Sequence, residues 1–223
     1  MPALTDKPPA TTAATPATLT STAPSGDIIR LPRKTIDRIL IAFGAVAAVV
    51  FVVAGGLLTW GASFSNDYVH DELASQNVFF PDKAELEAEG RDDLFDHAGK
   101  QVTNGNEAEA YASYIGGHLE GIADGKTYSE IDDRGAAAAV TAAQESGATD
   151  TEVATLQATA NQLKGQRDTL FKGETLRGLL LSSYAWSMIG MIAGIAAVVA
   201  FVAAAIMAIL TVAGEVHLKR THR

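Results

Sequence analysis

The sequence contains no cysteine among its 223 residues. This absence excludes a disulfide framework, a thiolate zinc site, an iron–sulfur cluster and lipid attachment to a cysteine. Charge is missing as well from two long stretches, residues 39–62 and residues 178–214. A membrane-spanning helix needs about 20 apolar residues, so each stretch is long enough to cross a bilayer. The two stretches exclude an ordinary soluble protein and predict two transmembrane helices.

The first 38 residues divide into a polar tail and a basic flank. Ala, Thr and Pro account for 18 of the first 26 positions, and a segment with so few aliphatic residues cannot bury enough apolar surface to fold. We therefore expect a disordered tail, which is either only solvated or docks to a partner through its Thr and Ser residues. Four basic residues follow, directly before the first apolar stretch: Arg30, Arg33, Lys34 and Arg38.

The first apolar stretch could be an uncut anchor or a secretory signal peptide. A signal peptide has an apolar region of roughly 7–15 residues close to the N-terminus. This stretch has 24 residues and begins only at Ile39. The tripeptide Gly61-Ala62-Ser63 resembles a cleavage site but does not outweigh that misfit. Length and position favour an uncut transmembrane helix over residues 39–62.

The second apolar stretch is longer than one crossing requires. Its 37 residues would extend for about 55 Å as a helix, against a hydrocarbon core of about 30 Å. Tyr184, Trp186 and Trp60 are expected at the membrane–water interface, because aromatic rings with a polar edge settle among the head groups. We therefore place the second crossing near residues 186–212 and predict a juxtamembrane turn at residues 179–183.

Basic residues near the first stretch predict the orientation of the chain. Four Lys or Arg residues precede it, and none occurs in residues 63–82 after it. The positive-inside rule then places both termini in the cytoplasm and the intervening residues outside a plasma membrane. Four basic residues on the supposed outer side oppose this orientation: Lys164, Arg167, Lys172 and Arg177. These four residues count little against the predicted orientation, because long loops translocate largely regardless of charge.

The segment between the stretches is acidic and poor in large apolar residues. Residues 64–177 carry 22 Asp or Glu against 9 Lys or Arg, and only 21 of these 114 positions are Leu, Ile, Val or Phe. An acidic surface argues against nucleic-acid binding, which requires basic groups to contact phosphates. The thin core favours a small helical domain stabilised by its anchors, a second copy or a partner, rather than an independent enzyme domain.

Helix signals dominate this segment. Residues 127–130 and residues 149–152 both have the capping-box pattern. The first box predicts a helix through residues 136–144 that ends at Gly147, and the second predicts a helix that can continue into the second apolar stretch. Three further elements are predicted: a helix over residues 107–123, an extended segment over residues 78–81 and a short helix over residues 82–89.

No complete catalytic or cofactor motif occurs in the sequence, so we expect no enzyme activity, no cofactor and no bound metal. His118 opens a His-x-Glu pattern like the first half of a zinc-deaminase signature, whose second half needs cysteines. Wheel positions place His118 on an apolar stripe with Tyr111, Ile115 and Ile122. This predicts a buried histidine bonded to a tyrosine or a backbone group. The alternative is a metal-binding envelope enzyme or sensor built from His118, Tyr111 and Tyr114.

Small residues mark candidate helix-packing faces. Gly190 and Gly194 form a G-x-x-x-G motif in the second stretch, and Gly44 and Ala48 form a small face on the first. Such faces let transmembrane helices approach closely, within one chain or between chains. A second set of glycines recurs every four residues in the intervening segment: Gly117, Gly121 and Gly125. We expect this ridge to admit another helix; the alternative is that the glycines weaken their helix and that Gly125 only caps it.

Several short segments share a further pattern: residues 110–112, 118–119, 122–123, 125–132, 169–171 and 177–186. The most specific part is Gly-Lys-Thr-Tyr at residues 125–128. Together they resemble a family of small two-span membrane proteins of actinobacteria, some labelled as aromatic ring-opening dioxygenases. The resemblance implies a two-span topology and an actinobacterial plasma membrane, with no established chemistry, because no matching iron-ligand motif is present. Residues 135–147 depart from the family and form an additional Ala-rich helix.

Together these patterns predict an all-α membrane protein with two transmembrane helices, a mostly helical domain between them and a disordered N-terminal tail. The expected divisions are residues 1–38, 39–62, 63–177, 178–214 and 215–223, the last being a basic cytoplasmic tail. The function expected is that of a non-enzymatic accessory or interaction subunit of a respiratory or cell-envelope complex. Its expected partners are the lipid bilayer and either a protein of that complex or a second copy, but no nucleic acid.

Overall fold

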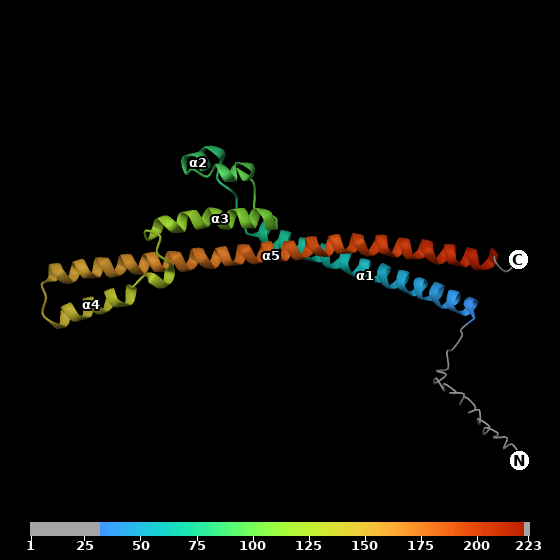
Figure 1. Ribbon diagram of the computed structural model, residues 1–223. Helices are drawn as coiled ribbons and strands as arrows, with labels where there is room; N and C mark the ends of the chain where they lie inside the picture. The colour runs from blue at the N-terminus through green and yellow to red at the C-terminus, as the bar shows by residue number, and fades with distance from the viewer. Residues whose placement is uncertain (1–31, 221–223) are drawn as a thin grey trace, which may run out of the picture.

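The computed structural model describes residues 32–220. These residues form five α-helices and two 3₁₀ helices: α1 (Arg33–Ser75), α2 (Lys83–Ala88), η1 (Asp92–His97), α3 (Gly105–Ile122), η2 (Tyr128–Glu130), α4 (Asp133–Glu145) and α5 (Asp150–Arg220) (Figure 1). Within the described part of the chain there is no β-strand, only an isolated antiparallel bridge between Phe79 and Gln101. The disordered tail predicted for residues 1–26 lies outside the described residues.

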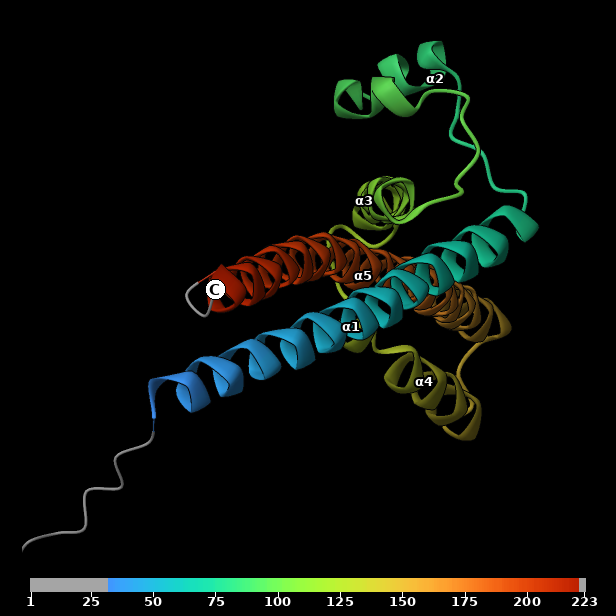
Figure 2. The same ribbon diagram turned by 90° about the vertical axis from the view of Figure 1, so that its right-hand side faces the viewer.

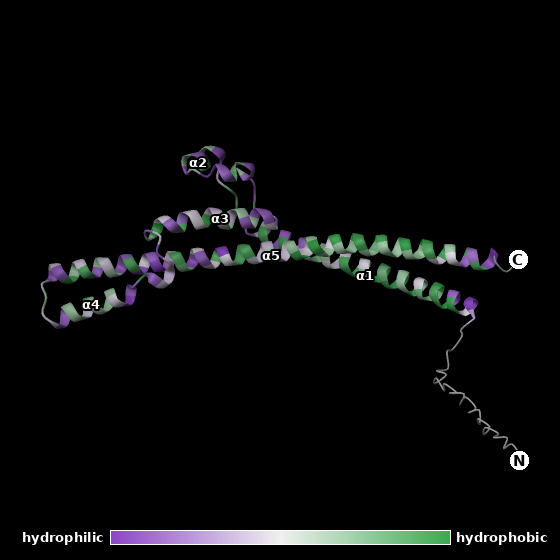
Figure 3. Cartoon of the chain, in the orientation of Figure 1, coloured by the Kyte–Doolittle hydropathy of each residue, from purple (hydrophilic) through white to green (hydrophobic). Residues whose placement is uncertain are grey.

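Within residues 32–220, α1 and α5 are the two helices long and apolar enough to cross a membrane. Only 11% and 17% of their most apolar windows are buried, whereas a core helix of a soluble protein is mostly buried. The helices cross, and their apolar parts lie together at one end of the molecule, as Figure 3 shows. The prediction of an all-α protein with two helices able to span a membrane is confirmed for the described residues.

α5 is one continuous helix of 71 residues, which corresponds to a length of roughly 105 Å. The predicted capping box begins it, because the backbone N–H and Oγ1 of Thr149 donate to Glu152 Oε2 at 2.9 and 2.8 Å. The continuation of this helix into the second apolar stretch is confirmed. The juxtamembrane turn predicted at residues 179–183 is wrong, since this Leu- and Ser-containing segment has no Pro or Gly and stays helical.

α3 and α4 pack along the polar half of α5 (Figure 2). α3 begins after Asn104, whose Oδ1 accepts the backbone N–H of Glu107 at 3.1 Å. The helix predicted over residues 107–123 is therefore confirmed within two residues. Its small residues Ala108 and Ala112 are buried, which allows the backbones of α3 and α5 to approach closely.

The capping box at residues 127–130 is present but begins a different element from the one predicted. Thr127 and Glu130 exchange backbone and side-chain hydrogen bonds around η2, which has only three residues. α4 has its own cap, Asp132, whose Oδ1 accepts the N–H of Gly135 at 2.8 Å. α4 ends as predicted before Gly147, which adopts a φ of 74° that favours glycine.

Residues 76–103 leave α1, form a compact excursion and return to α3; we refer to this excursion as the knob (Figure 1). The predicted extended segment and short helix are confirmed as the Phe79 bridge and α2. Four buried residues form its core: Phe80, Leu86, Leu94 and Val102. They join Val69 and Leu73 of α1 and Leu180 of α5 in one cluster. The same cluster contains Ala108 and Ala112 of α3, and η1 contacts α3, so the knob is packed rather than tethered loosely.

Candidate functional site

The small residues predicted to pack helices lie along the contact between α1 and α5. Gly44 is buried, and a Cβ there would lie 2.7 Å from Thr211 Oγ1. Gly190 is also buried, and its Cβ would lie 3.0 Å from that of Ser65. Gly44 and Gly190 thus occupy opposite ends of the antiparallel contact, and each meets the other helix within the same chain.

The neighbouring small residues contact the partner helix less tightly. A Cβ at Gly194 would lie 3.8 Å from that of Ala62, which is an ordinary van der Waals distance. Ala48 lines an apolar groove with Phe201 and Ala204 of α5. Every glycine and alanine of the two predicted faces therefore lies at the α1–α5 seam.

Two seam contacts were missed in the sequence. Gly55 is buried under the ring of Phe201, whose Cε1 would lie 2.9 Å from an added Cβ. Ser65 Oγ donates a 2.6 Å hydrogen bond to the carbonyl of Trp186. Gly55 follows Gly44 and Ala48 at helical spacing, so it could have been found; the partner of Ser65 depends on the register of two segments 121 residues apart.

The aromatic residues assigned to the membrane–water interface occupy different levels. Trp60 is 68% exposed and stacks on Phe64, which stacks on Tyr68, with ring centroids 5.8 and 6.2 Å apart. The Ser65 hydrogen bond places Trp186 level with Ser65, about 7 Å along the helix from Trp60. Tyr184 is partly buried, and its Cα would lie 3.2 Å from a Cβ at Gly105 of α3.

A groove of about 380 Å³ lies between α1 and α5 next to these aromatic residues; we refer to it as the α1–α5 groove. Its floor consists of the buried side chains Val69, Leu73 and Leu180. Its walls are exposed aromatic and leucine residues: Tyr68, Leu176, Leu179 and Trp186. Four polar residues complete the lining: Glu72, Gln76, Ser182 and Ser183. Glu72 is the only charged residue among those that line it.

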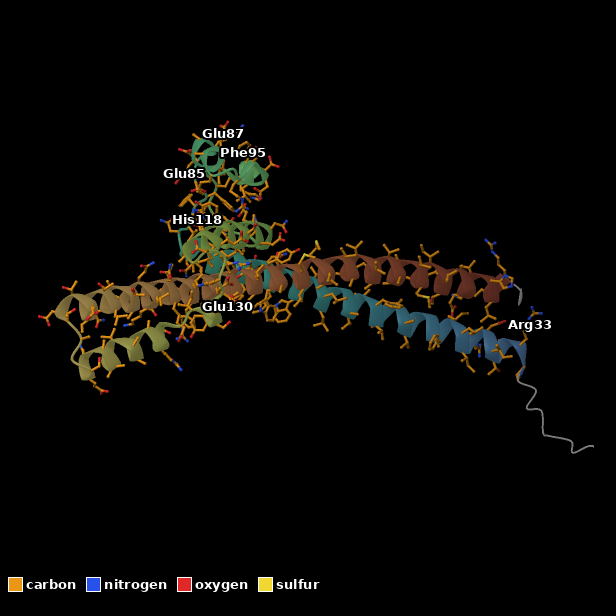
Figure 4. The ribbon with its side chains drawn as sticks, turned by 60° about the vertical axis from the view of Figure 1, so that its left-hand side comes forward. Arg33, Glu85, Glu87, Phe95, His118 and Glu130 are labelled. Carbon is orange, nitrogen blue, oxygen red and sulfur yellow. The ribbon has the colours of Figure 1, made fainter. Side chains whose placement is uncertain are left out.

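His118 lies between α3 and the knob, and its side chain is 51% exposed (Figure 4). Its Nδ1 lies 3.1 Å from the carbonyl of Tyr114 and its Nε2 lies 3.3 Å from Glu89 Oε1. The prediction of a buried histidine is wrong, although a tyrosine carbonyl is its partner. The buried side of α3 is instead formed by smaller residues and Leu119, which face α5.

A row of five rings connects the knob to α3. His97, Phe80, Tyr111, Tyr114 and His118 follow one another with centroid separations of 5.0, 5.2, 5.5 and 4.5 Å. Aromatic pairs at these distances each stabilise a structure by about 0.5–1.5 kcal/mol beyond their burial. The three residues singled out for a possible metal site are thus brought together, and their rings contribute to packing.

Metal binding would require more ligands than the described residues place together. Besides His118 and Glu89, the histidines of this region have other contacts: His97 stacks on Phe80, and His70 lies 3.2 Å from the carbonyl of Thr103. In the part of the chain that the structure describes, no three His, Cys, Asp or Glu residues form a group that could hold a metal ion.

Burial and Glu89 change the acidity of the Tyr114 hydroxyl. Burial is the larger cause and the negative charge of Glu89 adds to it, so the pKa of Tyr114 is raised to about 12. The hydroxyl donates to Glu89 Oε1 at 3.5 Å. Nearby, hydrogen bonds from the Arg91 guanidinium lower the pKa of Asp93. The same guanidinium donates to the carbonyl of Ser113 at 3.2 Å, which links the knob to α3 a second time.

The raised pKa of Tyr114 predicts a loss of stability in alkaline solution. The folded protein resists ionisation up to about pH 12, whereas an unfolded tyrosine ionises near pH 10. The contribution of Tyr114 is therefore complete below pH 10 and is lost between about pH 10 and 12. Thermal unfolding of the full chain in detergent, followed at several pH values, should show this decline. A Tyr114→Phe variant should show a shallower one, and an identical decline would assign it to other groups.

Two arginines join the polar half of α5 to the other elements. Arg167 forms an ion pair with Asp133 of α4, donates to the hydroxyl of Tyr128 at 3.1 Å and lies 4.6 Å from its ring centroid. Arg177 donates to the carbonyl of Ala112 of α3 at 3.2 Å and to both oxygens of Glu174 at 2.7 and 2.9 Å. These two basic residues therefore have structural partners within residues 32–220.

The glycine ridge predicted to admit another helix does not do so. Gly121 and Gly125 have no neighbour within 4 Å of an added Cβ, and Gly117 meets only the Arg91 side chain. Gly125 instead adopts a φ of 77° and ends α3. Close helix contacts of this region involve other glycines: Gly105 against Ser187, Gly116 against Arg177, and Gly173 against Leu119.

A second, polar pocket of about 510 Å³ lies beside the turn at residues 125–128. Its charged lining residues carry both signs: Glu120, Lys126, Glu174 and Arg177. Glu174 and Arg177 neutralise each other, so the pocket has no strong excess of either charge.

Comparison of the chain with protein-family models, curated proteins and solved structures finds no match.

Proposed function

We propose that the protein is a two-span protein of the plasma membrane with both termini in the cytoplasm. Arg33, Lys34 and Arg38 of α1 and Lys219 and Arg220 of α5 lie at the same end of the antiparallel pair, since Gly214 contacts Ile41. Basic residues concentrate on the cytoplasmic side of membrane helices. This common basic end supports a cytoplasmic position for both termini.

The contacts of α1 beyond its apolar stretch support an uncut anchor over a signal peptide. α1 continues through residues 61–63 without a break and ends only at Ser75. Between residue 63 and the end of α1, Ser65, Val69 and Leu73 are buried against the rest of the protein. Cleavage after Ala62 would leave these residues without the span that positions them.

The ion pairs of Arg167 and Arg177 support the same orientation. These were two of the four basic residues that opposed it on the outer side. Both side chains are engaged with Asp133 or Glu174, so their charge is balanced locally. Long loops and folded domains translocate largely regardless of their charge, so these two residues carry little orienting weight compared with the basic residues at the start of α1.

The role we propose is that of a non-enzymatic accessory or interaction subunit of a larger membrane complex, respiratory or cell-envelope in type. The observation that carries this role is the continuity of α5. Its first 36 residues would hold α3 and α4 up to roughly 50 Å from the bilayer on a rigid support. Two exposed apolar residues on this part of α5 lie outside the lining of the α1–α5 groove and would offer a partner contact area: Phe171 and Leu181.

Reporter fusions test the proposed topology. Fusions after residues 10 and 222 should be active with a cytoplasmic reporter and inactive with a periplasm- or envelope-dependent one. A fusion at residue 110, on α3, should show the opposite pattern, because α3 follows the first crossing. A cytoplasmic signal at residue 110 would contradict the two-span topology and with it the outward position of α3, α4 and the knob.

Native sizing tests the proposed partner. Extraction in mild detergent should give a particle larger than one 23.3 kDa chain with its micelle, because Phe171 and Leu181 of α5 would be covered by another protein. Mass spectrometry should identify the same co-purifying chain in repeated preparations. A Leu181→Ser variant should release that chain, and a Gly165→Ser variant, at an open position of α5, should keep it. A lone monomer in wild type would contradict the role as a subunit.

A further inference from the structure

The two long helices differ in where their charged residues begin. α1 has charged residues from Asp67 onward, whereas α5 has none from Gly178 to Gly214. The Ser65–Trp186 hydrogen bond sets their register, so residues 178–186 of α5 lie beside residues 65–73 of α1. At this level the helix pair is acidic on the α1 side and apolar on the α5 side.

The α1–α5 groove lies at this level and continues from the proposed span. Trp60, Phe64 and Tyr68 are spaced by four residues and stack along one face of α1. The same spacing leads to Glu72 and Gln76, which line the groove. One exposed aromatic face therefore leads from the apolar part of α1 directly to a carboxylate. The groove itself covers about ten residues of helix, or about 15 Å.

Charges of both signs lie at the end of this aromatic face that is farther from the proposed span. Glu72 is exposed, and the ion pairs of residues 32–220 do not include it. Lys172 is also exposed and lies one helical turn beyond Leu176, on the same face of α5. A carboxylate on α1 and an ammonium group on the facing side of α5 complement a head group that carries an amine and a phosphate. An aromatic face next to a carboxylate also attracts an ammonium ion.

We propose that the α1–α5 groove binds a zwitterionic, amine-bearing phospholipid, with the upper part of one acyl chain on Val69, Leu73 and Leu180 and the amine at Glu72. The phosphate lies toward Lys172. The lipid stands one to two helical turns above its neighbours in the outer leaflet, because the groove lies beyond the aromatic residues. This inference rests on the proposed function, since only that topology places the groove at the outer leaflet.

Two observations favour a zwitterionic lipid over other occupants. The segment that carries the groove has 22 acidic against 9 basic residues, which repels lipids of net negative charge. The exposed walls of the groove are apolar, so a polar peptide would leave backbone groups without hydrogen-bond partners. A lipid chain has no such groups, and it enters the groove along a surface that is already apolar.

Photolabelling of the full chain tests this proposal. The protein is reconstituted into vesicles of phosphatidylethanolamine and phosphatidylglycerol, with a trace of either lipid carrying a diazirine close to the head group on one acyl chain. Adducts are mapped by proteolysis and mass spectrometry. We expect the phosphatidylethanolamine probe to label residues 176–186 about threefold more than the phosphatidylglycerol probe, the range of a partly exposed ion pair. Both probes should label the span around Ile192 and Val199 equally.

Four variants test which residue selects between the two lipid probes and whether the labelled lipid lies in the groove. Glu72→Gln should lower the ratio of the two probes clearly below threefold, because it removes the carboxylate that binds the amine, while the other acidic residues of the segment still repel the anionic probe. Asp71→Asn is the matched control, because Asp71 is an exposed acid of the same turn outside the groove lining. Ser182→Trp should fill the groove and abolish its labelling. Ala185→Trp, at an exposed position outside the lining, should leave the labelling unchanged.

The outcomes separate this inference from the proposed function. Labelling of the span without enrichment at residues 176–186, or labelling there that Ser182→Trp leaves unchanged, would overturn the lipid site and leave the topology standing. No labelling of the span would overturn both. A disulfide-linked dimer of a Leu179→Cys variant, with no lipid adduct in the groove, would assign the groove to a second copy and also overturn the lipid site.

Discussion

Replacing Gly190 with isoleucine should force α1 and α5 apart at the end of their seam nearest the knob. A Cβ at this position would already lie 3.0 Å from Ser65 Cβ and 3.2 Å from Asn66 Oδ1, and isoleucine adds three more carbons. Overpacking of this kind costs about 1–3 kcal/mol. The displacement would also break the 2.6 Å hydrogen bond from Ser65 to Trp186. Helix separation follows, because lipid supplies little hydrophobic drive to restore the contact.

A single engineered disulfide measures this effect. Ala62 and Gly194 are suited to it, because their Cβ atoms would lie 3.8 Å apart, near the mean for natural disulfides. The chain has no other cysteine. Ala62→Cys with Gly194→Cys should therefore crosslink readily in wild type. Gly190→Ile should lower the crosslinked fraction about tenfold or more, as a loss of about 1.4 kcal/mol or more implies.

Gly56→Ile is the matched control for this experiment. Gly56 lies on α1 next to the tightly packed Gly55, but nothing lies within 4 Å of an added Cβ. The same substitution there should leave the crosslink intact, since isoleucine would only extend into lipid. An undiminished crosslink in Gly190→Ile would show that α1 and α5 do not pack through Gly190 in the membrane.

The elements that the sequence predicted well are those with local signals. Caps and helix ends depend on residues three or four apart, so the boxes at Thr149 and Thr127 and the left-handed turn at Gly147 could be found. Apolar run length likewise identified both long helices. The box at Thr127 was assigned to the wrong helix, because the competing cap at Asp132 has the same local chemistry.

Residues that depend on tertiary contacts were predicted less well. The wheel placed the buried face of α3 through Tyr111 and His118, because it ranks positions by hydrophobicity alone. α5 instead contacts the small residues of α3, where the backbones can approach closely. The signal was present, since Gly105, Ala108 and Ala112 recur at helical spacing. The large rings of α3 instead contact the knob, and nothing in the local sequence pattern indicates this contact.

The continuity of α5 has a similar explanation. A turn was placed at residues 179–183 because the uncharged run exceeds the thickness of a bilayer. The structure accommodates the excess differently: Leu180 is buried in the same core cluster as Leu73 of α1, and Gly105 of α3 lies against α5 just beyond this segment. An uncharged run can thus exceed one crossing when part of it packs against protein, which no property of the run alone reveals.

Gly105→Ala and Gly121→Ala, the same substitution in one helix, should change stability in opposite directions. A methyl group at Gly105 would overlap Ser187 and lie 3.2 Å from the Cα of Tyr184. That Cα belongs to the backbone of α5 and cannot rotate away, so α3 must shift at a cost of about 1–3 kcal/mol. At Gly121 nothing lies within 4 Å, and alanine should stabilise the helix by about 0.4–1 kcal/mol through the unfolded state.

Hydrogen exchange of the α3 amides in the full chain distinguishes the two variants. Local opening of α3 sets the exchange rate, so Gly105→Ala should speed exchange by about tenfold or more, since about 1.4 kcal/mol corresponds to a factor of ten. Gly121→Ala should slow it by a few-fold. Amides of α4 report the specificity, because α4 contacts α5 at a different site and should exchange at the wild-type rate in both. Slower exchange of α3 in Gly105→Ala would mean that this helix does not rest on α5 through Gly105.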